Sequence, residues 1–222
     1  MVTGPEALTE VTEGPEGVAA GAATGTTVIQ MSTVGRASTQ RLAEALPDGV
    51  QLLDAPVLGS RDEAETGTLK IFAGGPPELV ERWTPVLSAL GSVLPVGPVG
   101  AGTAAKLVVN TTLVGVIAVL GEALALADGL GLSRSSAFEL LGVTALASQA
   151  ERRREAFESD DYPPRFSLSL ARKDADLILE AAAASGLDLR LVEAARSWLV
   201  EAEEAGAGDQ DYAAVLARIA RT

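Results

Sequence analysis

The segment from Thr103 to Gly129 constrains the fold more than any other part of this sequence. Its residues predict one long helix that is apolar on nearly all sides, and other elements must enclose such a helix. The longest apolar run, Leu107–Leu120, is interrupted by Asn110 and by the residues that follow it. Because this run is too short and too polar to cross a membrane, we expect a buried helix and no membrane span.

The pattern changes near residue 97. Before it, short runs of strand-forming residues alternate with helical stretches, which is typical of a layered α/β domain, and after residue 100 the pattern is helical throughout. We therefore predict an α/β domain over residues 1–97 and an all-α domain, built round the long central helix, over residues 98–222. The predicted strands are Thr27–Ser32, Val50–Asp54, Thr68–Phe72 and Ser92–Val96. The other predicted helices are Ala37–Leu46, Pro76–Leu90, Arg134–Leu141, Ser148–Phe157, Leu168–Ser185, Leu189–Gly206 and Asp209–Ile219.

Charge and missing residue types exclude several function classes. With 17 basic and 30 acidic residues the net charge is −13, so we expect no nucleic-acid partner. The chain has no cysteine and no histidine, which excludes disulfides, Ser-His-Asp triads and Cys or His metal sites, and we predict no metal site. Lysine is a remaining proton carrier, and the sequence holds three: Lys70, Lys106 and Lys173.

The segment Gly100–Asn110 carries the strongest candidate for catalysis. Lys106 and Asn110 are four residues apart, so they share one face of the predicted helix. Their neighbours are apolar, and a lysine that loses solvation can donate a proton near neutral pH. Gly100 and Gly102 would let another backbone or a ligand approach the start of the helix. The alternative is a lysine that extends to solvent beside a capping amide.

Two weaker motifs offer other polar groups. Asp54–Ser60 ends a predicted strand, and the Ser60 hydroxyl and the Gly59 N–H could hold a carboxylate or a hydroxyl group; the alternative is an ordinary turn. Lys173 comes early in a predicted helix, where a cation opposes the helix dipole, so another interaction must retain it. The alternative is a surface salt bridge with Asp174 or Asp176.

A turn at Gly206–Tyr212 opens the last predicted helix. Asp209 is the residue that we predict as its N-cap, which is a structural role. The first 25 residues lack the basic start of a signal peptide, so we expect a cytoplasmic protein.

Together these segments resemble the β-hydroxyacid dehydrogenases, the group of 3-hydroxyisobutyrate dehydrogenase and the glyoxylate/succinic semialdehyde reductases within the 6-phosphogluconate dehydrogenase superfamily. The matches are collinear and extend over nearly the whole chain, which makes them far more specific than any single motif. The matching segments are Val28–Thr33, Asp54–Val57, Gly100–Asn110, Phe166–Asp174 and Gly208–Tyr212.

The resemblance implies an oxidoreductase that transfers hydride between NAD or NADP and a small carbonyl or hydroxy compound. It also implies a partial Rossmann-type domain and a homodimer formed through the helical domain. The roles that it implies are catalytic acid and base for Lys106, substrate binding for Gly59, Ser60 and Asn110, and cofactor binding for Thr33 and Lys173.

The sequence departs from the family pattern in two places. Leu58 stands where the family usually has a substrate-binding serine, which favours a bulkier or less polar substrate than a small hydroxyacid. Lys106 argues against the imine reductases, which typically carry another residue there.

The second departure concerns the start of the chain. The family's Gly-x-Gly-x-x-Gly turn is missing, and Met1 aligns just after the family's fourth strand. We therefore expect the chain to lack about two βα units.

Two hypotheses follow from the second departure. In the first, the chain is the larger part of a β-hydroxyacid dehydrogenase, with weak or absent binding of NAD(P)H and impaired activity by itself. In the second, it is a non-catalytic remnant that acts as a helical dimerisation module. The missing segment also carries the residue that would distinguish NAD from NADP.

Overall fold

The computed structural model describes residues 1–221. The chain forms two compact units, Met1–Val109 and Asn110–Thr222. The predicted domain boundary at residue 97 lies upstream of this division, so the start of the long helix belongs to the first unit.

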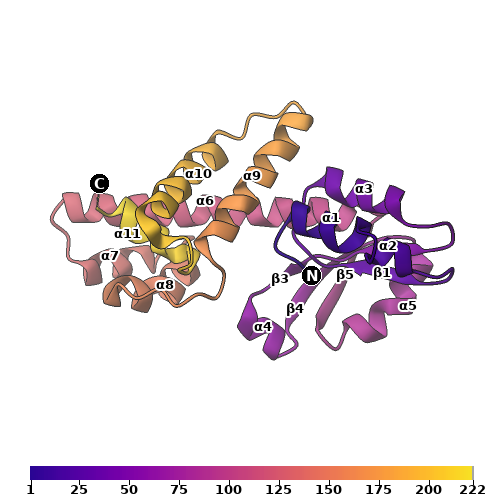
Figure 1. The fold of residues 1–222 in the computed structure, drawn as a ribbon. Helices are drawn as coiled ribbons and strands as arrows, with labels where there is room; N and C mark the ends of the chain where they lie inside the picture. The colour runs from indigo at the N-terminus through magenta and orange to yellow at the C-terminus, as the bar shows by residue number, and fades with distance from the viewer. Residues whose placement is uncertain (222) are drawn as a thin grey trace. The chain divides into compact units, whose positions relative to one another are not determined.

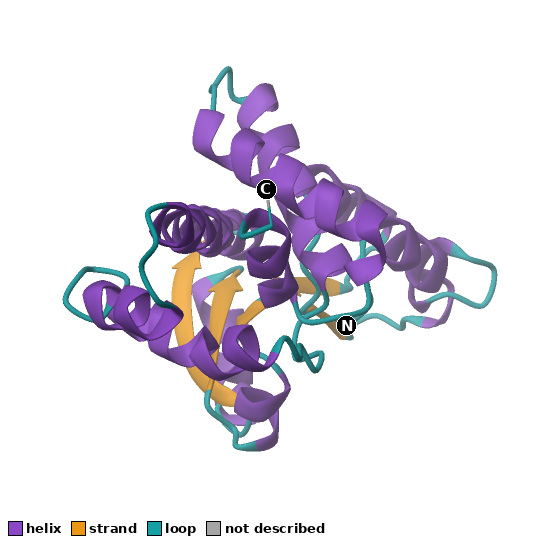
Figure 2. Cartoon of the chain, turned by 90° about the vertical axis from the view of Figure 1, so that its left-hand side faces the viewer, coloured by secondary structure: helices purple, strands orange, loops and turns teal. Residues whose placement is uncertain are grey.

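The first unit contains a mixed β-sheet (Figures 1 and 2). β1 and β2 are parallel, β4 and β5 are parallel, and the short β3 runs antiparallel to β4. Four strands lie where the alternating pattern predicts them, whereas the two-residue β3 was not predicted. The strands are β1 (Thr27–Gln30), β2 (Gln51–Asp54), β3 (Val57–Leu58), β4 (Leu69–Gly74) and β5 (Gly91–Gly97).

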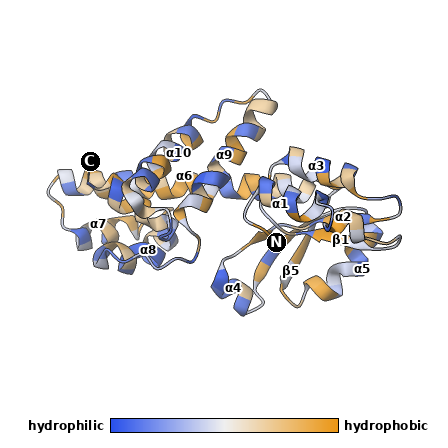
Figure 3. Cartoon of the chain, in the orientation of Figure 1, coloured by the Kyte–Doolittle hydropathy of each residue, from blue (hydrophilic) through white to orange (hydrophobic). Residues whose placement is uncertain are grey.

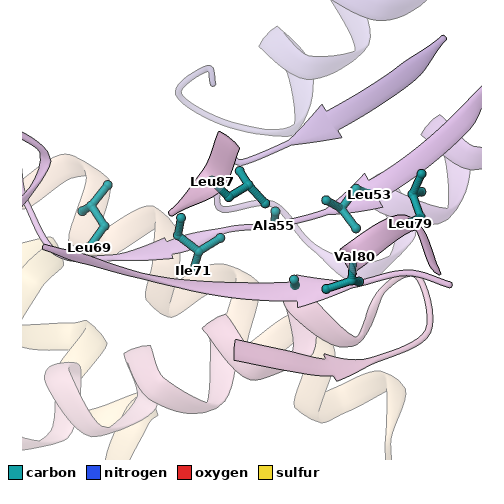
Figure 4. Close-up of a cluster of buried hydrophobic side chains, with 8 residues drawn as sticks. Leu53, Ala55, Leu69, Ile71, Leu79, Val80 and Leu87 are labelled. Carbon is teal, nitrogen blue, oxygen red and sulfur yellow. The ribbon is translucent and has the colours of Figure 1, made fainter. Parts of the chain in front are cut away.

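Helices cover both faces of this sheet. Successive residues of a strand point to opposite faces, so Leu52 and Leu53 of β2 enter different apolar clusters. Leu53 packs with residues of β4 and α5 (Figure 4), whereas Leu52 packs with Leu8 of α1 and Leu42 of α3. The predicted α/β architecture is therefore confirmed. The helices of this unit are α1 (Pro5–Glu13), α2 (Val18–Gly21), α3 (Arg36–Ala45), α4 (Arg61–Glu65) and α5 (Pro77–Leu87).

The second unit is helical and is built round α6 (Ala101–Gly129), the long helix that the sequence predicts. Figure 3 shows how apolar α6 is along its length. Its length and composition would also suit a membrane span, but half of its most apolar window is buried by the rest of the chain. Gly121 packs so tightly that a Cβ there would lie 2.5 Å from Ile219 Cδ1. The remaining α-helices are α7 (Arg134–Leu141), α8 (Ala147–Ser159), α9 (Leu168–Ala184), α10 (Arg190–Ala202) and α11 (Val215–Ile219).

The structure corrects the predicted start of the last helix. Helical turns begin at Tyr212 rather than at Asp209, first as the short 3₁₀ segment η2 (Tyr212–Ala214). Asp211 is its N-cap and accepts a hydrogen bond from the Ala213 N–H at 3.0 Å, so the predicted cap at Asp209 is wrong. The reason is a contact distant in sequence: the Asp211 carboxylate also accepts the backbone N–H groups of Arg165 and Phe166, which fixes the turn at residue 211.

Candidate active site

The start of α6 is fixed against the sheet by the absence of a side chain at Gly102. A Cβ at this position would lie 2.4 Å from the carbonyl oxygen of Asp54 and 2.4 Å from that of Phe72. Because no real Cβ atom approaches an oxygen so closely, only glycine fits against these two carbonyl groups of β2 and β4. The expectation that Gly102 allows another backbone to approach the helix is therefore confirmed.

A buried carboxylate binds the first turn of α6. Asp54 is fully buried, and its two oxygens accept the Thr103 N–H at 2.7 Å and the Thr103 hydroxyl at 2.9 Å. The Thr103 hydroxyl proton is used in this bond, so the Thr39 hydroxyl, 2.9 Å away, donates to Thr103. Burial raises the pKa of Asp54, and the hydrogen bonds from Thr103 and from the N–H groups of Gly100 and Gly102 oppose that rise.

Lys106 and Asn110 follow on successive turns of α6. Lys106 is 8% exposed and Asn110 is 2% exposed. Their spacing places them on one face of the helix, as the sequence predicts. The solvent-extended lysine that was the alternative does not fit a side chain with so little exposure.

Asp174 links Asn110 to Lys173 within the helical unit. The Asn110 amide donates to Asp174 Oδ2 at 2.6 Å, and Lys173 Nζ lies 2.7 Å from Asp174 Oδ1. Asp174 is 2% exposed, so this ion pair is buried at its acidic end and is not a surface salt bridge.

Asp174 was not predicted as a functional residue, although the sequence contains a signal for it. Ala171, Asp174, Ala175 and Ile178 recur at helical spacing and form the buried face of α9. An acidic residue inside an otherwise apolar face needs a partner, and that requirement could have identified it.

Asn110 also borders a small apolar cavity in the helical unit. Its Nδ2 is used by Asp174, and no described residue donates a hydrogen bond to its buried Oδ1. The rings of Phe166 and Tyr212 line this cavity and pack edge to face, with centroids 5.6 Å apart. The other lining residues are Leu113, Val114, Ile117, Ala171, Asp174 and Leu199.

Gly59 and Ser60 have local structural roles in the loop between β3 and α4. Gly59 has φ +129°, and a Cβ there would lie 2.6 Å from Leu69 Cδ2. Ser60 is the N-cap of α4, and its N–H and its hydroxyl both donate to Glu63 Oε2, at 2.7 and 2.8 Å. These contacts account for both residue types, and the role in substrate binding stays a prediction.

The six predicted site residues are divided between the two units. In the second unit, Asn110 and Lys173 are joined through Asp174. The first unit carries the others: Lys106 on α6, Gly59 and Ser60 beside α4, and Thr33, half-buried, between β1 and α3. The described residues contain no group of three or more acidic side chains that could hold a metal ion.

Both halves of the chain match family models of nicotinamide-binding proteins. Residues 1–109 match the NAD binding domain of 6-phosphogluconate dehydrogenase. Residues 100–219 match the NAD-binding region of NADP-dependent 3-hydroxyisobutyrate dehydrogenase. The fold and these models define an NAD(P)-dependent oxidoreductase of the β-hydroxyacid dehydrogenase type.

Curated relatives and solved structures agree with that class. The chain is 36% identical to 2-(hydroxymethyl)glutarate dehydrogenase of Eubacterium barkeri, over 93% of this chain and 70% of the relative. It is 33% identical to 3-sulfolactaldehyde reductase of Escherichia coli K12, over 99% of this chain and 75% of the relative. The crystal structure of 3-hydroxyisobutyrate dehydrogenase from Salmonella typhimurium superimposes with a TM-score of 0.83 and 29% identity, covering 98% of this chain and 77% of that one.

The chain belongs to the 3-hydroxyisobutyrate dehydrogenase and 6-phosphogluconate dehydrogenase-like family. The family resemblance deduced from ordered sequence motifs is thereby confirmed.

Proposed function

We propose that this chain catalyses hydride transfer between NAD(P) and a small carbonyl or hydroxy compound, with Lys106 as the proton donor and acceptor. The observation that supports the proposal is the burial of Lys106, which is 8% exposed. Lys106 lies on α6 between Thr103, which Asp54 binds, and Asn110. A lysine side chain can give a proton to a substrate oxygen and take it back, and its ammonium group carries three N–H donors.

Each residue has one task in this proposal. Lys106 Nζ gives a proton to the carbonyl oxygen during reduction and takes it back from the hydroxyl during oxidation. One Nδ2–H of Asn110 is donated to Asp174, and its second Nδ2–H orients that oxygen. The nicotinamide, when bound, supplies or accepts the hydride.

The loop between β1 and α3 offers backbone and hydroxyl groups that could bind an anionic part of a dinucleotide. Gly35 is the N-cap of α3, and no side chain among the described residues caps this end, so the N–H groups of Arg36 and Ala37 can bind an anionic group. Thr33 adds a hydroxyl, and Lys173 of the helical unit is the cation that we assign to the cofactor. The sequence contains no Gly-x-Gly-x-x-Gly turn, and we therefore expect weak binding of NAD(P)H by this chain.

The substrate that we propose is a small molecule with an aldehyde or a hydroxyl group. The names of the relatives, 2-(hydroxymethyl)glutarate dehydrogenase and 3-sulfolactaldehyde reductase, support this class. Because the Ser60 hydroxyl donates to Glu63, we assign the Gly59 N–H as the main donor of that loop to the substrate. Leu58 favours a less polar substrate group.

We also propose a homodimer that forms through the helical unit. Val119 and Leu126 of α6 and Leu130 just beyond its end are 42%, 62% and 71% exposed, and a second copy would cover them. We further propose a cytoplasmic protein without nucleic-acid or membrane partners. The net charge of −13 and the burial of half of the most apolar window of α6 support this proposal.

The test combines turnover and cofactor binding. Semialdehydes and 2-ketoacids are screened with NADH and NADPH, and the best pair is then measured with Lys106→Ala. We expect kcat to fall by about 10³-fold or more, because general acid and base catalysis is lost. Lys70→Ala is the matched control, because Lys70 is exposed and donates to Ser92. Retained turnover in Lys106→Ala would remove Lys106 from its proposed role.

Calorimetry separates the two hypotheses about this chain. Measurable binding of NADH or NADPH together with turnover supports the oxidoreductase. A chain that binds neither cofactor, turns over no substrate and still dimerises would support the non-catalytic dimerisation module instead.

A further inference from the structure

Asp54 binds the N-terminal turn of α6 with both oxygens of its carboxylate. The carboxylate is fully buried at the end of β2 and accepts two hydrogen bonds from Thr103, one from the backbone and one from the side chain. The N–H groups of Gly100 and Gly102 also act on it. A negative charge at a helix N-terminus is stabilised by the helix dipole and by the N–H groups that have no partner within the helix.

Backbone contacts limit the movement of the same turn. Gly102 lies against the carbonyl oxygens of Asp54 and Phe72, with no room for a Cβ. Gly74 also leaves no room for a side chain, because a Cβ there would lie 2.7 Å from the Gly102 nitrogen. The Thr39 hydroxyl holds Thr103 from α3. Three separate elements, β2, β4 and α3, therefore locate one helical turn.

Lys106 depends on that turn for its position. It follows Thr103 by three residues, so both side chains lie on the same side of α6, one turn apart. A helix is stiff over one turn, and a displacement of its first residues moves the lysine Cα by a similar amount. Catalytic groups tolerate little displacement, since a shift of about 1 Å can cost on the order of 100-fold in rate.

We propose that Asp54 is a positioning residue: its buried carboxylate fixes the first turn of α6 and thereby the point from which Lys106 exchanges its proton. The proposal rests on the proposed function of Lys106. Asp54 itself touches neither substrate nor cofactor in this mechanism. Its effect is transmitted by Thr103, which it holds through both the backbone and the side chain.

Kinetics distinguish positioning from simple stability. In Asp54→Asn the side chain keeps its size but presents one acceptor oxygen instead of two and loses its charge. We expect kcat to fall by about 10- to 100-fold, while KM for substrate and cofactor changes less than about threefold. Thr103→Val, which removes only the hydroxyl donor, should lower kcat by a smaller factor. It also provides a second test if Asp54→Asn does not fold.

A matched control destabilises the first unit at a buried apolar residue away from Asp54. Leu87 of α5 is 2% exposed in the apolar cluster shared with β4, and α5 takes no part in fixing the first turn of α6. Leu87→Ala should lower the melting temperature and leave kcat unchanged. If Leu87→Ala lowers kcat as much as Asp54→Asn does, or if Asp54→Asn and Thr103→Val keep the wild-type kcat, the proposal is overturned.

A second readout does not require activity. The chain has only three lysines, so lysine labelled with ¹³C at Cε gives three NMR signals, which Lys→Arg substitutions assign. We expect Asp54→Asn to move the Lys106 signal and to leave that of Lys70 in place. An unmoved Lys106 signal contradicts the proposal even in an inactive chain. Absence of turnover in the wild-type chain would instead count against the proposed function alone.

Discussion

Single residues in this chain carry roles that their neighbours in sequence do not reveal. Lys106 and Asn110 could be predicted, because their spacing and apolar surroundings are local properties of one helix. Thr103 as the partner of Asp54, and Asn110 as the second partner of Asp174, could not be predicted, because they lie 49 and 64 residues away in the sequence. One sequence shows that an acidic residue lies in an apolar pattern, but its partner follows only from the tertiary fold.

The buried carboxyl of Asp54 should make stability depend on pH. Its pKa in the folded chain is raised above the ordinary value of 3.8, chiefly by burial. The folded state then binds the proton more tightly than the unfolded state does. The contribution of Asp54 to stability is therefore fully present below pH 3.8 and is lost as the pH rises through the raised pKa.

Chemical denaturation across that range measures this effect. We expect wild type to lose stability relative to Asp54→Asn as the pH rises from about 3 to 7, because asparagine does not titrate. A difference in the free energy of unfolding that is independent of pH, or that grows in favour of wild type as the pH rises, would contradict a raised pKa for Asp54.

At the scale of elements, hydrophobic periodicity predicted most of the fold. Long patterns such as α6, α7 and α9 begin and end within a few residues of the prediction, because their apolar faces extend over several turns. The helices α1, α2 and α4 were not predicted, since they are short and contain few buried residues. The last helix was predicted to start too early, because its start depends on the hydrogen bonds from the backbone of Arg165 and Phe166 to Asp211.

The Asp211 contacts allow a test of that last point. Its carboxylate accepts three backbone N–H groups, from Arg165, Phe166 and Ala213. We expect Asp211→Ala to lower the free energy of unfolding by about 2 kcal/mol, since a cap and further hydrogen bonds are lost. Asp209→Ala, at an exposed position two residues away, should change it by less than about 0.5 kcal/mol. Equal effects of the two substitutions would show that Asp211 is not the cap.

At the scale of the whole molecule, an α/β unit followed by a helical unit could be predicted. The reason is that alternating strand and helix patterns give way abruptly to purely helical patterns near residue 100. The predicted α/β unit followed by a helical unit is what the structure shows. Assembly is different, since exposed apolar residues indicate that a surface is covered but do not identify what covers it.

The proposed homodimer can be tested at the exposed side of α6. Leu126 is 62% exposed, and Leu126→Glu would place a charge in the proposed contact. We expect sedimentation to show a dimer for wild type and a monomer for this variant. Leu90→Glu, at a 40% exposed position of the first unit, is the control and should stay dimeric. A dimeric Leu126→Glu variant, or a monomeric wild type, would exclude this interface.

The contact between Asp211 and the Phe166 loop also affects the order of events during synthesis. Asp211 lies 45 residues after Phe166, so the loop cannot make this contact until residue 211 has left the ribosome. The cavity beside Asn110, which Phe166 and Tyr212 line, is therefore completed at a late stage. A nascent chain arrested before that residue would have α6 and most of α9 but would lack a finished wall around Asn110.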